Sequence, residues 1–420
     1  MKLLPLAVAL LSLTLVSAKP VKPRSGATVD WPAWRGADRT GISHETGLMT
    51  SWPEGGPKLL WKCSGLGEGF STPSVAGKLI YGMGNANGQE WVFALDRTKE
   101  GRQVWATPLG SVRHDGGGYA GPRSTPTVDG GRVYALGLNG DLVALDAKNG
   151  NVIWRHDLKG EFGGAVGGWG YSESVLVDGP WVVCTPGGAQ ATMLALTKDD
   201  GTPVWQAKVG DVADYSSIIK IEVDGVKQYV QLTHQGVIGV NAANGEFLWR
   251  YNAPANGTAN ASTPVFGEAG VFAASGYGNG GGLVHLTRSG DQFEAKEVYF
   301  TKNMKSQHGG FVLVDGFIYG SDEGVFTCLD FKTGETKWTD REPQKGSVVC
   351  ADGMLFCRGE GAKVSLVRAT PEKCELLGQF DEPERSGKAT WPYPVVADGR
   401  LYLRDQDNLF CYDVRGDGKP

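Results

Sequence analysis

The sequence predicts an all-β protein, an eight-bladed β-propeller of four-stranded antiparallel blades, and three observations support this prediction. Glycine is abundant, with 63 residues among 420, which is about twice average usage and typical of a chain with many turns. Short apolar runs alternate with separators such as Asp-Gly-Gly and Asn-Gly-Asp, whose Gly and Asn residues suit tight hairpins. The whole pattern returns about every 40–50 residues, which is the spacing of propeller blades.

The clearest single repeat is residues 124–154, which read STPTVDGGRVYALGLNGDLVALDAKNGNVIW. It holds apolar runs separated by three turn signals, and four strands joined by three hairpins make one small antiparallel sheet. This repeat therefore predicts one complete blade.

The N-terminus carries the pattern of a secretory signal peptide over residues 1–18. Lys2 precedes an apolar run that ends in the small residues Val16-Ser17-Ala18, which suit a cleavage site. The run is too short for a membrane helix and nothing similar follows it, so we expect no transmembrane helix after cleavage. No Cys follows the cleavage point, which argues against a lipid anchor there. We expect an exported, soluble and monomeric protein, periplasmic or extracellular.

Residues 19–57 are expected to form a leader and an N-terminal packing segment. Residues 19–28 are rich in Lys and Pro, as in a flexible leader. The following stretch contains Trp31, Trp34 and Trp52, and this aromatic content predicts that it packs on the domain.

Residues 58–415 are expected to form the propeller. A lone strand at 58–62 precedes the first full repeat, and the last repeat supplies three strands before the chain ends. These pieces are predicted to share one blade and close the ring, which protects strand edges. Because the seventh repeat is degenerate, seven blades remain an alternative. The repeats occupy residues 71–105, 124–154, 173–205, 216–249, 262–300, 310–338, 347–380 and 391–413.

The most regular signature is Gly, three residues and then Trp, which recurs at the last hairpin of the repeats. The Gly suits the positive φ of a hairpin, and the Trp is expected to wedge between neighbouring blades, burying about 150–250 Å². In the fifth repeat Tyr299 or Phe300 replaces Trp. The tryptophans assigned this structural role are Trp61, Trp105, Trp154, Trp205, Trp249 and Trp338.

The chain has seven cysteines. Because this number is odd, at least one of them cannot form a disulfide within the chain. Cys328 and Cys411 occupy a slot filled by Ala or Gly in other repeats and are expected as small core residues first and as disulfide partners second. We expect no bridge between Cys350 and Cys357. Without a Cys-x-x-Cys pair or a His cluster, no zinc site is indicated, and a net charge of −5 gives no basic footprint for nucleic acid.

The recurring Ala-Leu-Asp, short Gly turn and Trp resemble the repeat of pyrroloquinoline-quinone (PQQ) propellers. Residues 31–36 (WPAWRG), 169–174 (WGYSES) and 403–407 (LRDQD) resemble exported PQQ-like repeat proteins. One branch with this repeat comprises quinoprotein alcohol dehydrogenases, in which PQQ and Ca²⁺ lie on the propeller axis. Another is the lipoprotein scaffold of outer-membrane protein assembly, which binds no cofactor.

The repeat itself is structural and does not choose between these branches. The dehydrogenases carry an adjacent Cys-Cys disulfide beside the quinone, and this sequence has no neighbouring cysteines and no Cys-x-x-Cys-His haem motif. The lipid-anchoring Cys of the scaffold branch is also missing. The resemblance thus implies the fold and leaves the function open.

Function in a propeller gathers at a mouth of the central channel, where innermost strands begin. Small residues dominate these starts, and Glu173 and Tyr393 break the rule. A carboxylate in a ring of hydroxyls could ligate Ca²⁺ or act as a base, or Glu173 could be solvated at the rim. The candidate ligand-binding residues at this mouth are Arg123, Trp169, Tyr171, Glu173, Tyr215, His308, Trp391 and Tyr393, with Phe70 and Tyr119 nearby.

These residues support three hypotheses, besides the alternative that the rings only plug the channel. The first is a non-catalytic binding or scaffold protein that holds a protein or extracellular ligand at the channel mouth. The second is a PQQ- and Ca²⁺-dependent alcohol dehydrogenase, in which Glu173 would ligate Ca²⁺, Arg123 would contact the quinone and Trp169 or Trp391 would stack on it. The third is carbohydrate binding. No catalytic residue or assured cofactor is assigned.

Overall fold

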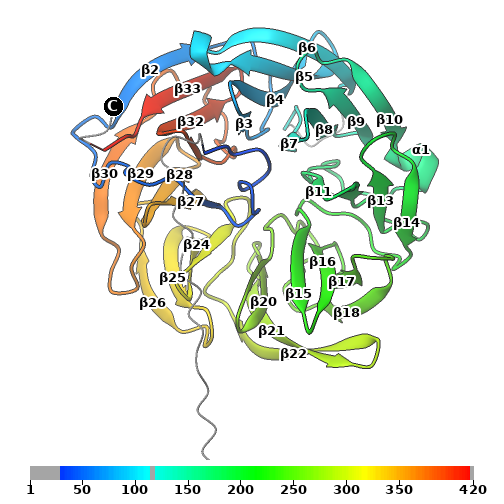
Figure 1. The fold of residues 1–420 in the computed structure, drawn as a ribbon. Coiled ribbons are helices and arrows are strands. Elements are labelled where there is room, and N and C mark those ends of the chain that lie inside the picture. Colours follow the sequence, from blue (N-terminus) through cyan, green and yellow to red (C-terminus); the bar gives the residue numbers. More distant parts are fainter. Residues whose placement is uncertain (1–28, 114–118, 417–420) are drawn as a thin grey trace, which may run out of the picture.

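The computed structural model of the protein describes residues 29–113 and 119–416, which form a closed ring of eight blades (Figure 1). Each blade is an antiparallel sheet of four strands, and one blade gains a fifth, parallel strand. The eight-bladed propeller predicted from the sequence is confirmed, and the seven-blade alternative is wrong. The predicted signal peptide, residues 1–18, and leader, residues 19–28, lie outside the described residues.

The first four blades follow the chain, each from its innermost to its outermost strand. Blade 1 comprises β3 (Ser74–Ala76), β4 (Leu79–Ala86), β5 (Gln89–Asp96) and β6 (Arg102–Ser111). Blade 2 comprises β7 (Thr127–Asp129), β8 (Arg132–Leu136), β9 (Asp141–Asp146) and β10 (Val152–Asp157). Blade 3 comprises β11 (Leu176–Asp178), β12 (Trp181–Cys184), β13 (Met193–Thr197) and β14 (Pro203–Ala207). Blade 4 comprises β15 (Ile219–Val223), β16 (Val226–Leu232), β17 (Val237–Asn241) and β18 (Phe247–Tyr251).

The remaining blades include two that recruit a strand from the part of the chain before the first full repeat. Blade 5 comprises β19 (Val265–Gly267), β20 (Gly270–Ser275), β21 (Gly280–Ser289) and β22 (Gln292–Thr301). Blade 6 comprises β23 (Phe311–Val314), β24 (Phe317–Asp322), β25 (Val325–Asp330) and β26 (Thr336–Asp340). Blade 7 comprises β1 (Ile42–Ser43), β27 (Gly346–Ala351), β28 (Met354–Gly359), β29 (Lys363–Arg368) and β30 (Leu376–Asp381). Blade 8 comprises β31 (Val395–Ala397), β32 (Arg400–Asp405), β33 (Asn408–Asp413) and β2 (Lys58–Cys63).

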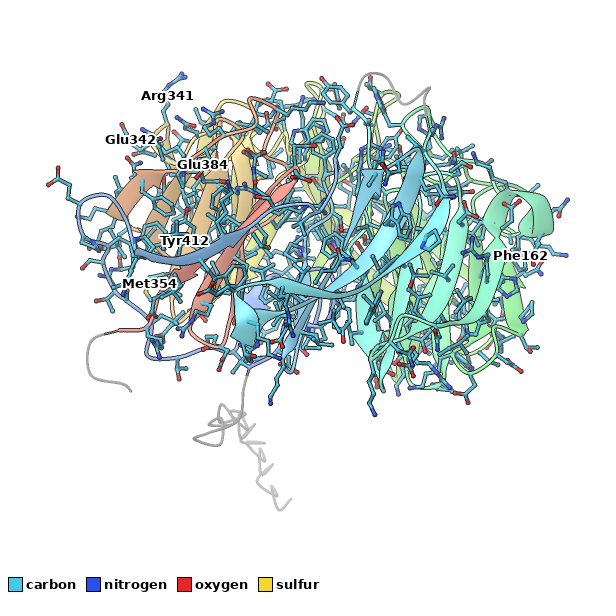
Figure 2. All side chains as sticks on the ribbon, turned by 90° about the horizontal axis from the view of Figure 1, so that it is seen from above. Phe162, Arg341, Glu342, Met354, Glu384 and Tyr412 are labelled. Carbon is cyan, nitrogen blue, oxygen red and sulfur yellow. The ribbon has the colours of Figure 1, made fainter. Side chains whose placement is uncertain are left out.

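Helical structure in the described residues is limited to η1 (Arg97–Lys99) and α1 (Leu158–Phe162). No helix in this part of the chain is long and apolar enough to cross a membrane. Figure 2 views the ring edge-on, with the charged side chains of Arg341 and Glu342 projecting from its surface.

Strand β2 closes the ring, as the sequence predicts. It pairs antiparallel with β33, with Trp61 opposite Cys411, so both ends of the propeller lie in one sheet (Figure 1). Cys411 and Cys328 are fully buried and lie opposite Trp61 and Trp338 on the neighbouring strands. They are the small core residues that the sequence predicts.

The outer-strand tryptophans interlock consecutive blades. A Cβ atom on Gly150 would lie only 2.6 Å from the ring of Trp105, and one on Gly245 would lie 2.4 Å from the ring of Trp205. Glycine is therefore required at this hairpin position for two reasons. It adopts a positive φ (75° at Gly150), and its missing side chain leaves the space that the Trp of the preceding blade fills. Most of the predicted structural tryptophans are buried, while Trp61 and Trp338 are half-buried.

Blades 5 and 7 depart from this signature in different ways. In blade 5, Tyr299 pairs with Leu283 at the position of the Trp and packs on Gly334. In blade 7 the corresponding residue is Gly378, paired with Leu366. A Cβ atom there would lie 2.6 Å from the Cβ of Trp52.

Trp52 from the N-terminal segment therefore completes blade 7. Its ring lies 5.8 Å from Phe356 and 5.4 Å from Phe380, and its amide donates to the carbonyl of Leu377. The degenerate second half of the seventh repeat forms a regular blade because the missing Trp is supplied from a distant part of the chain.

The segment before Trp52 runs through the centre of the ring (Figure 1), and we call residues 31–43 the axial plug. Trp31 exchanges two 2.8 Å backbone hydrogen bonds with Val75 of blade 1. Arg39 donates to the carbonyls of Ser174, Val175 and Ile218 at 2.7, 3.1 and 2.9 Å, which ties blade 3 to blade 4.

The rest of the plug reaches the other blades. Its further partners are Val128 in blade 2, Thr263 in blade 5, Phe311 in blade 6, Cys350 in blade 7 and Val396 in blade 8. The plug thus contacts all eight blades and occupies the axis beneath the candidate site.

Candidate functional site

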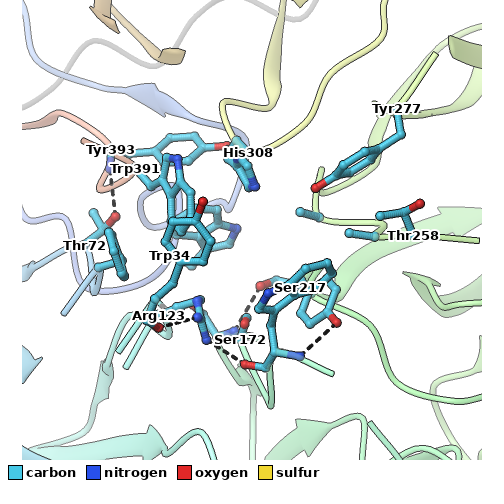
Figure 3. A pocket seen from close by; sticks show the side chains of 17 residues that line it. Trp34, Thr72, Arg123, Ser172, Ser217, Thr258, Tyr277, His308, Trp391 and Tyr393 are labelled. Carbon is cyan, nitrogen blue, oxygen red and sulfur yellow. Dashed lines mark hydrogen bonds between the residues drawn. The ribbon is translucent and has the colours of Figure 1, made fainter. Parts of the chain in front are cut away.

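A cavity of about 390 Å³ lies at one mouth of the axis, above the plug (Figure 3). Most of its walls come from the segments that lead into the innermost strands, as the sequence predicts for a propeller mouth. Its described lining residues are Trp34, Phe70, Thr72, Tyr119, Arg123, Trp169, Ser172, Ser174, Tyr215, Ser217, Thr258, Ala259, Ala261, Tyr277, His308, Trp391 and Tyr393.

One side of the cavity is a packed group of rings, the stacked wall, formed by Phe70, Tyr119, His308 and Trp391. The Trp391 ring lies 4.4 Å from His308 at an interplanar angle of 28°. Phe70 and Tyr119 lie 4.6 and 4.8 Å from the same indole. Each ring restricts its neighbours, so this wall is preorganised.

Two buried arginines hold the segments that carry the stacked wall. Arg358 forms a bidentate ion pair with Glu382 and donates to the carbonyls of Pro392 and Arg404 at 2.9 and 2.7 Å. Arg404 in turn donates to the carbonyl of Ser71 at 3.1 Å. The neighbours of Trp391 and Phe70 are therefore fixed by charge-assisted hydrogen bonds.

The opposite side is more open and is formed by Trp169, Tyr215, Thr258 and Tyr277. Trp169 meets Tyr215 edge-to-face at 5.7 Å. Tyr277 is 43% exposed and adopts a φ of +57°, a conformation that costs a non-glycine residue about 1 kcal/mol or more. Its ring faces the cavity (Figure 3), so the strained turn presents an aromatic face to whatever enters.

The cavity has a positive bias. Arg123 donates to the carbonyls of Trp169 and Tyr119 at 2.6 and 2.7 Å, and burial lowers its pKa to about 10. His308 lies 3.3 Å from Glu360, which also pairs with Lys345. No Asp, Glu, Asn or Gln is among the described lining residues, so a bound group would meet aromatic faces, hydroxyls, the His308 ring and the guanidinium of Arg123.

The structure brings together Arg123, Trp169, Tyr215, His308, Trp391 and Tyr393 of the eight candidate residues. Tyr171 and Glu173 do not line the cavity. Tyr171 is 1% exposed in the hydrophobic core, and its hydroxyl donates to the carbonyl of Pro186 at 2.8 Å.

Glu173 lies buried beside the plug, so the alternative of a solvated Glu173 at the rim does not hold. It is 2% exposed, and its carboxyl oxygens accept from the amide and hydroxyl of Thr185 at 2.6 and 3.0 Å. Burial raises the pKa of Glu173 to about 8, opposed by the Thr185 hydrogen bonds and the charge of Arg39. The carboxyl is largely protonated at neutral pH.

The sequence interpretation missed Trp34 and Tyr277. Trp34 packs edge-to-face on Tyr393 at 4.5 Å and forms part of the cavity lining from the plug. Tyr277 stands in a hairpin between Gly276 and Gly278. A large ring isolated between turn glycines was the signal that could have identified it.

The residues present do not fit the Ca²⁺ of a quinoprotein. Calcium takes six to eight oxygen ligands, whereas Glu173, the one predicted ligand, lies outside the cavity with both oxygens engaged by Thr185. The described residues contain no group of three or more His, Cys, Asp or Glu side chains placed to hold a metal.

Comparison with known proteins supports the predicted resemblance. Residues 88–340 match a family model described as outer membrane protein assembly factor BamB. The protein of that name from Burkholderia pseudomallei is 27% identical over 276 residues, which cover 63% of this chain and 65% of that protein. The match spans slightly less than two thirds of this relative's length.

Solved structures share the fold with both branches. BamB from Moraxella catarrhalis has a TM-score of 0.61 at 13% identity, covering 86% of this chain and 99% of that chain. A quinohemoprotein alcohol dehydrogenase from Comamonas testosteroni has a TM-score of 0.66 at 12% identity, covering 93% and 81%. Since an assembly factor and an oxidoreductase share this architecture, the fold does not specify the function.

Proposed function

The chain belongs to the family of the outer membrane protein assembly factor BamB, and from this premise we propose that it is a non-catalytic binding protein. In this proposal, the cavity at the channel mouth holds an apolar or aromatic group of a partner protein. The proposal includes export to the periplasm or the cell exterior, suggested by the signal-peptide pattern at residues 1–18, and a soluble monomeric state.

The observation that carries the proposal is the aromatic cavity itself. Its volume of about 390 Å³ lies within the usual range of ligand pockets. Trp, Tyr and Arg are the residues that most often dominate protein interfaces. Here Trp391 and Tyr119 belong to the preorganised stacked wall that faces the exposed Tyr277, and Arg123 also lines the cavity. Rings held in advance lose little conformational entropy on binding.

The charges of the cavity narrow the class of partner. Arg123 lines it without any described lining carboxylate, so a buried Lys or Arg of a partner would lack a counter-charge in the lining. A neutral or acidic segment with one bulky ring is favoured. The described lining also has no carboxylate or carboxamide to bind sugar hydroxyls, so a sugar would meet only hydroxyls, aromatic faces, Arg123 and His308.

The test is a selection of displayed random peptides on the full protein, followed by affinity measurement with each enriched synthetic peptide. We expect the enriched peptides to contain an aromatic residue with acidic neighbours. Their affinity for Tyr277→Gly should be at least about tenfold weaker than for wild type, since losing a ring contact of about 1.4 kcal/mol has this effect. The matched control is Phe247→Ala, an exposed ring outside the cavity, which should leave the affinity unchanged.

Two outcomes would contradict the proposal. Peptides that bind Tyr277→Gly and wild type equally would place the interface elsewhere on the protein. A rise in melting temperature with PQQ and Ca²⁺, or specific binding of an oligosaccharide, without any peptide binder would favour the enzyme or the carbohydrate hypothesis.

A further inference from the structure

Among the described residues, the axial plug contains an arginine, Arg35, whose charge has no carboxylate partner, a feature that the proposed function does not use. Arg35 is 2% exposed. A guanidinium has five N–H donors, and Nη2 of Arg35 donates to the carbonyls of Thr40 and Phe311 at 2.7 and 2.6 Å. Nε and Nη1 have no hydrogen-bond partner among the described residues.

Two other buried arginines provide an internal comparison. Arg358 forms an ion pair with Glu382, and Arg404 is stabilised by the charges of Asp407 and Asp405. In the part of the chain that the structure describes, Arg35 has no carboxylate partner. A charged group that does interact with it is Arg39, whose charge has the same sign.

An uncompensated charge in a protein interior is costly, and buried charges in proteins are paired or ligated. A water molecule would satisfy an N–H donor but would leave the charge uncompensated. A small anion would do both, with the short charge-assisted hydrogen bonds that guanidinium groups form.

From this contrast we propose that Arg35 binds a small inorganic anion of the halide class on the propeller axis. The surroundings limit the size of the anion. A Cβ atom on Gly310 would lie 3.4 Å from Nη1 of Arg35 and 2.4 Å from the hydroxyl oxygen of Tyr393, so these groups pack closely around the guanidinium. The ion is therefore expected to be monatomic, such as chloride, and a large organic anion such as gluconate serves as the non-binding comparison.

The first test compares melting temperatures in sodium chloride and sodium gluconate at equal ionic strength. At about one hundred times the dissociation constant, chloride should raise the melting temperature of a domain of this size by about 3 °C. Arg35→Met should abolish the difference in melting temperature between the two salts. Met is chosen because it has the same conformational cost as Arg at the backbone φ of +61°. The control Arg341→Met, at an exposed position (Figure 2), should retain it.

The proposal is overturned if wild type melts equally in both salts, or if folded Arg35→Met keeps the chloride effect. A second measurement does not depend on the folding of Arg35→Met and uses the wild-type protein alone. Crystals grown in sodium bromide should show an anomalous peak within hydrogen-bonding distance of Nε or Nη1 of Arg35. Density without an anomalous signal at that place would identify water and refute the proposal.

Discussion

The axial plug and the cavity above it share the same inner strands but use them in opposite ways. The plug binds backbone carbonyls: Arg39 alone occupies those of Ser174, Val175 and Ile218. The cavity uses side chains from neighbouring positions and leaves Tyr119 and Tyr277 more than two fifths exposed. Most contacts of the plug are made within the chain, with Arg35 as an exception, whereas the ring faces of the cavity are left available. Stability and binding should therefore respond to different substitutions.

The largest effect should come from the plug. Arg39→Met would leave three buried carbonyls without their donor, and we expect a loss of about 3–5 kcal/mol in the free energy of unfolding. Urea denaturation measures this loss, with Arg341→Met as the exposed control expected within about 0.5 kcal/mol. A loss below about 1 kcal/mol would mean that the plug does not hold the blades together.

Trp52→Ala should be nearly as destabilising, at about 3 kcal/mol, because it removes a buried ring that completes blade 7. Trp52→Phe should recover part of this loss, since a smaller ring still packs on Phe356. Denaturation midpoints of the two variants provide the comparison. Equal stability of both variants would show that ring packing at Gly378 is unimportant.

Glu173→Gln should change how stability depends on pH. The folded-state pKa of about 8 lies above the ordinary value of 4.5, so folding favours the protonated form. Its contribution is complete below the ordinary pKa and is lost as the pH rises through 8. From about pH 6 to about pH 8, wild type should lose about 2 kcal/mol relative to Glu173→Gln. Parallel pH profiles from urea denaturation of the two proteins would be evidence against a buried, protonated Glu173.

The smallest effect on stability should be at the rim. Tyr277→Gly relieves a positive φ, so the free energy of unfolding should stay constant or rise by about 1 kcal/mol. Peptide binding should weaken in the same variant, because the exposed ring is lost. A destabilised variant would show instead that Tyr277 belongs to the packed structure, which would remove the contrast between plug and cavity.

Local patterns predicted much of the site. The six candidate residues that line the cavity were found by aligning the starts of the innermost strands, which depends only on the turn that follows each of them. The two candidates that do not line the cavity, Tyr171 and Glu173, are explained by the alternation of side chains along an extended chain. Ser172 and Ser174 line the cavity, whereas Tyr171 and Glu173 are buried in the protein.

The sequence by itself determined the blades, because hairpin turns, strand alternation and the Gly–Trp signature act over a few residues. Only the tertiary structure decided how the N-terminal segment is used. Arg39 and Ile218 are separated by 179 residues, and Trp34 and Thr263 by 229. No local pattern encodes such contacts, since they exist only after the ring closes and brings eight strand starts to one axis. The same closure buries Glu173 and opens the cavity beside Tyr277.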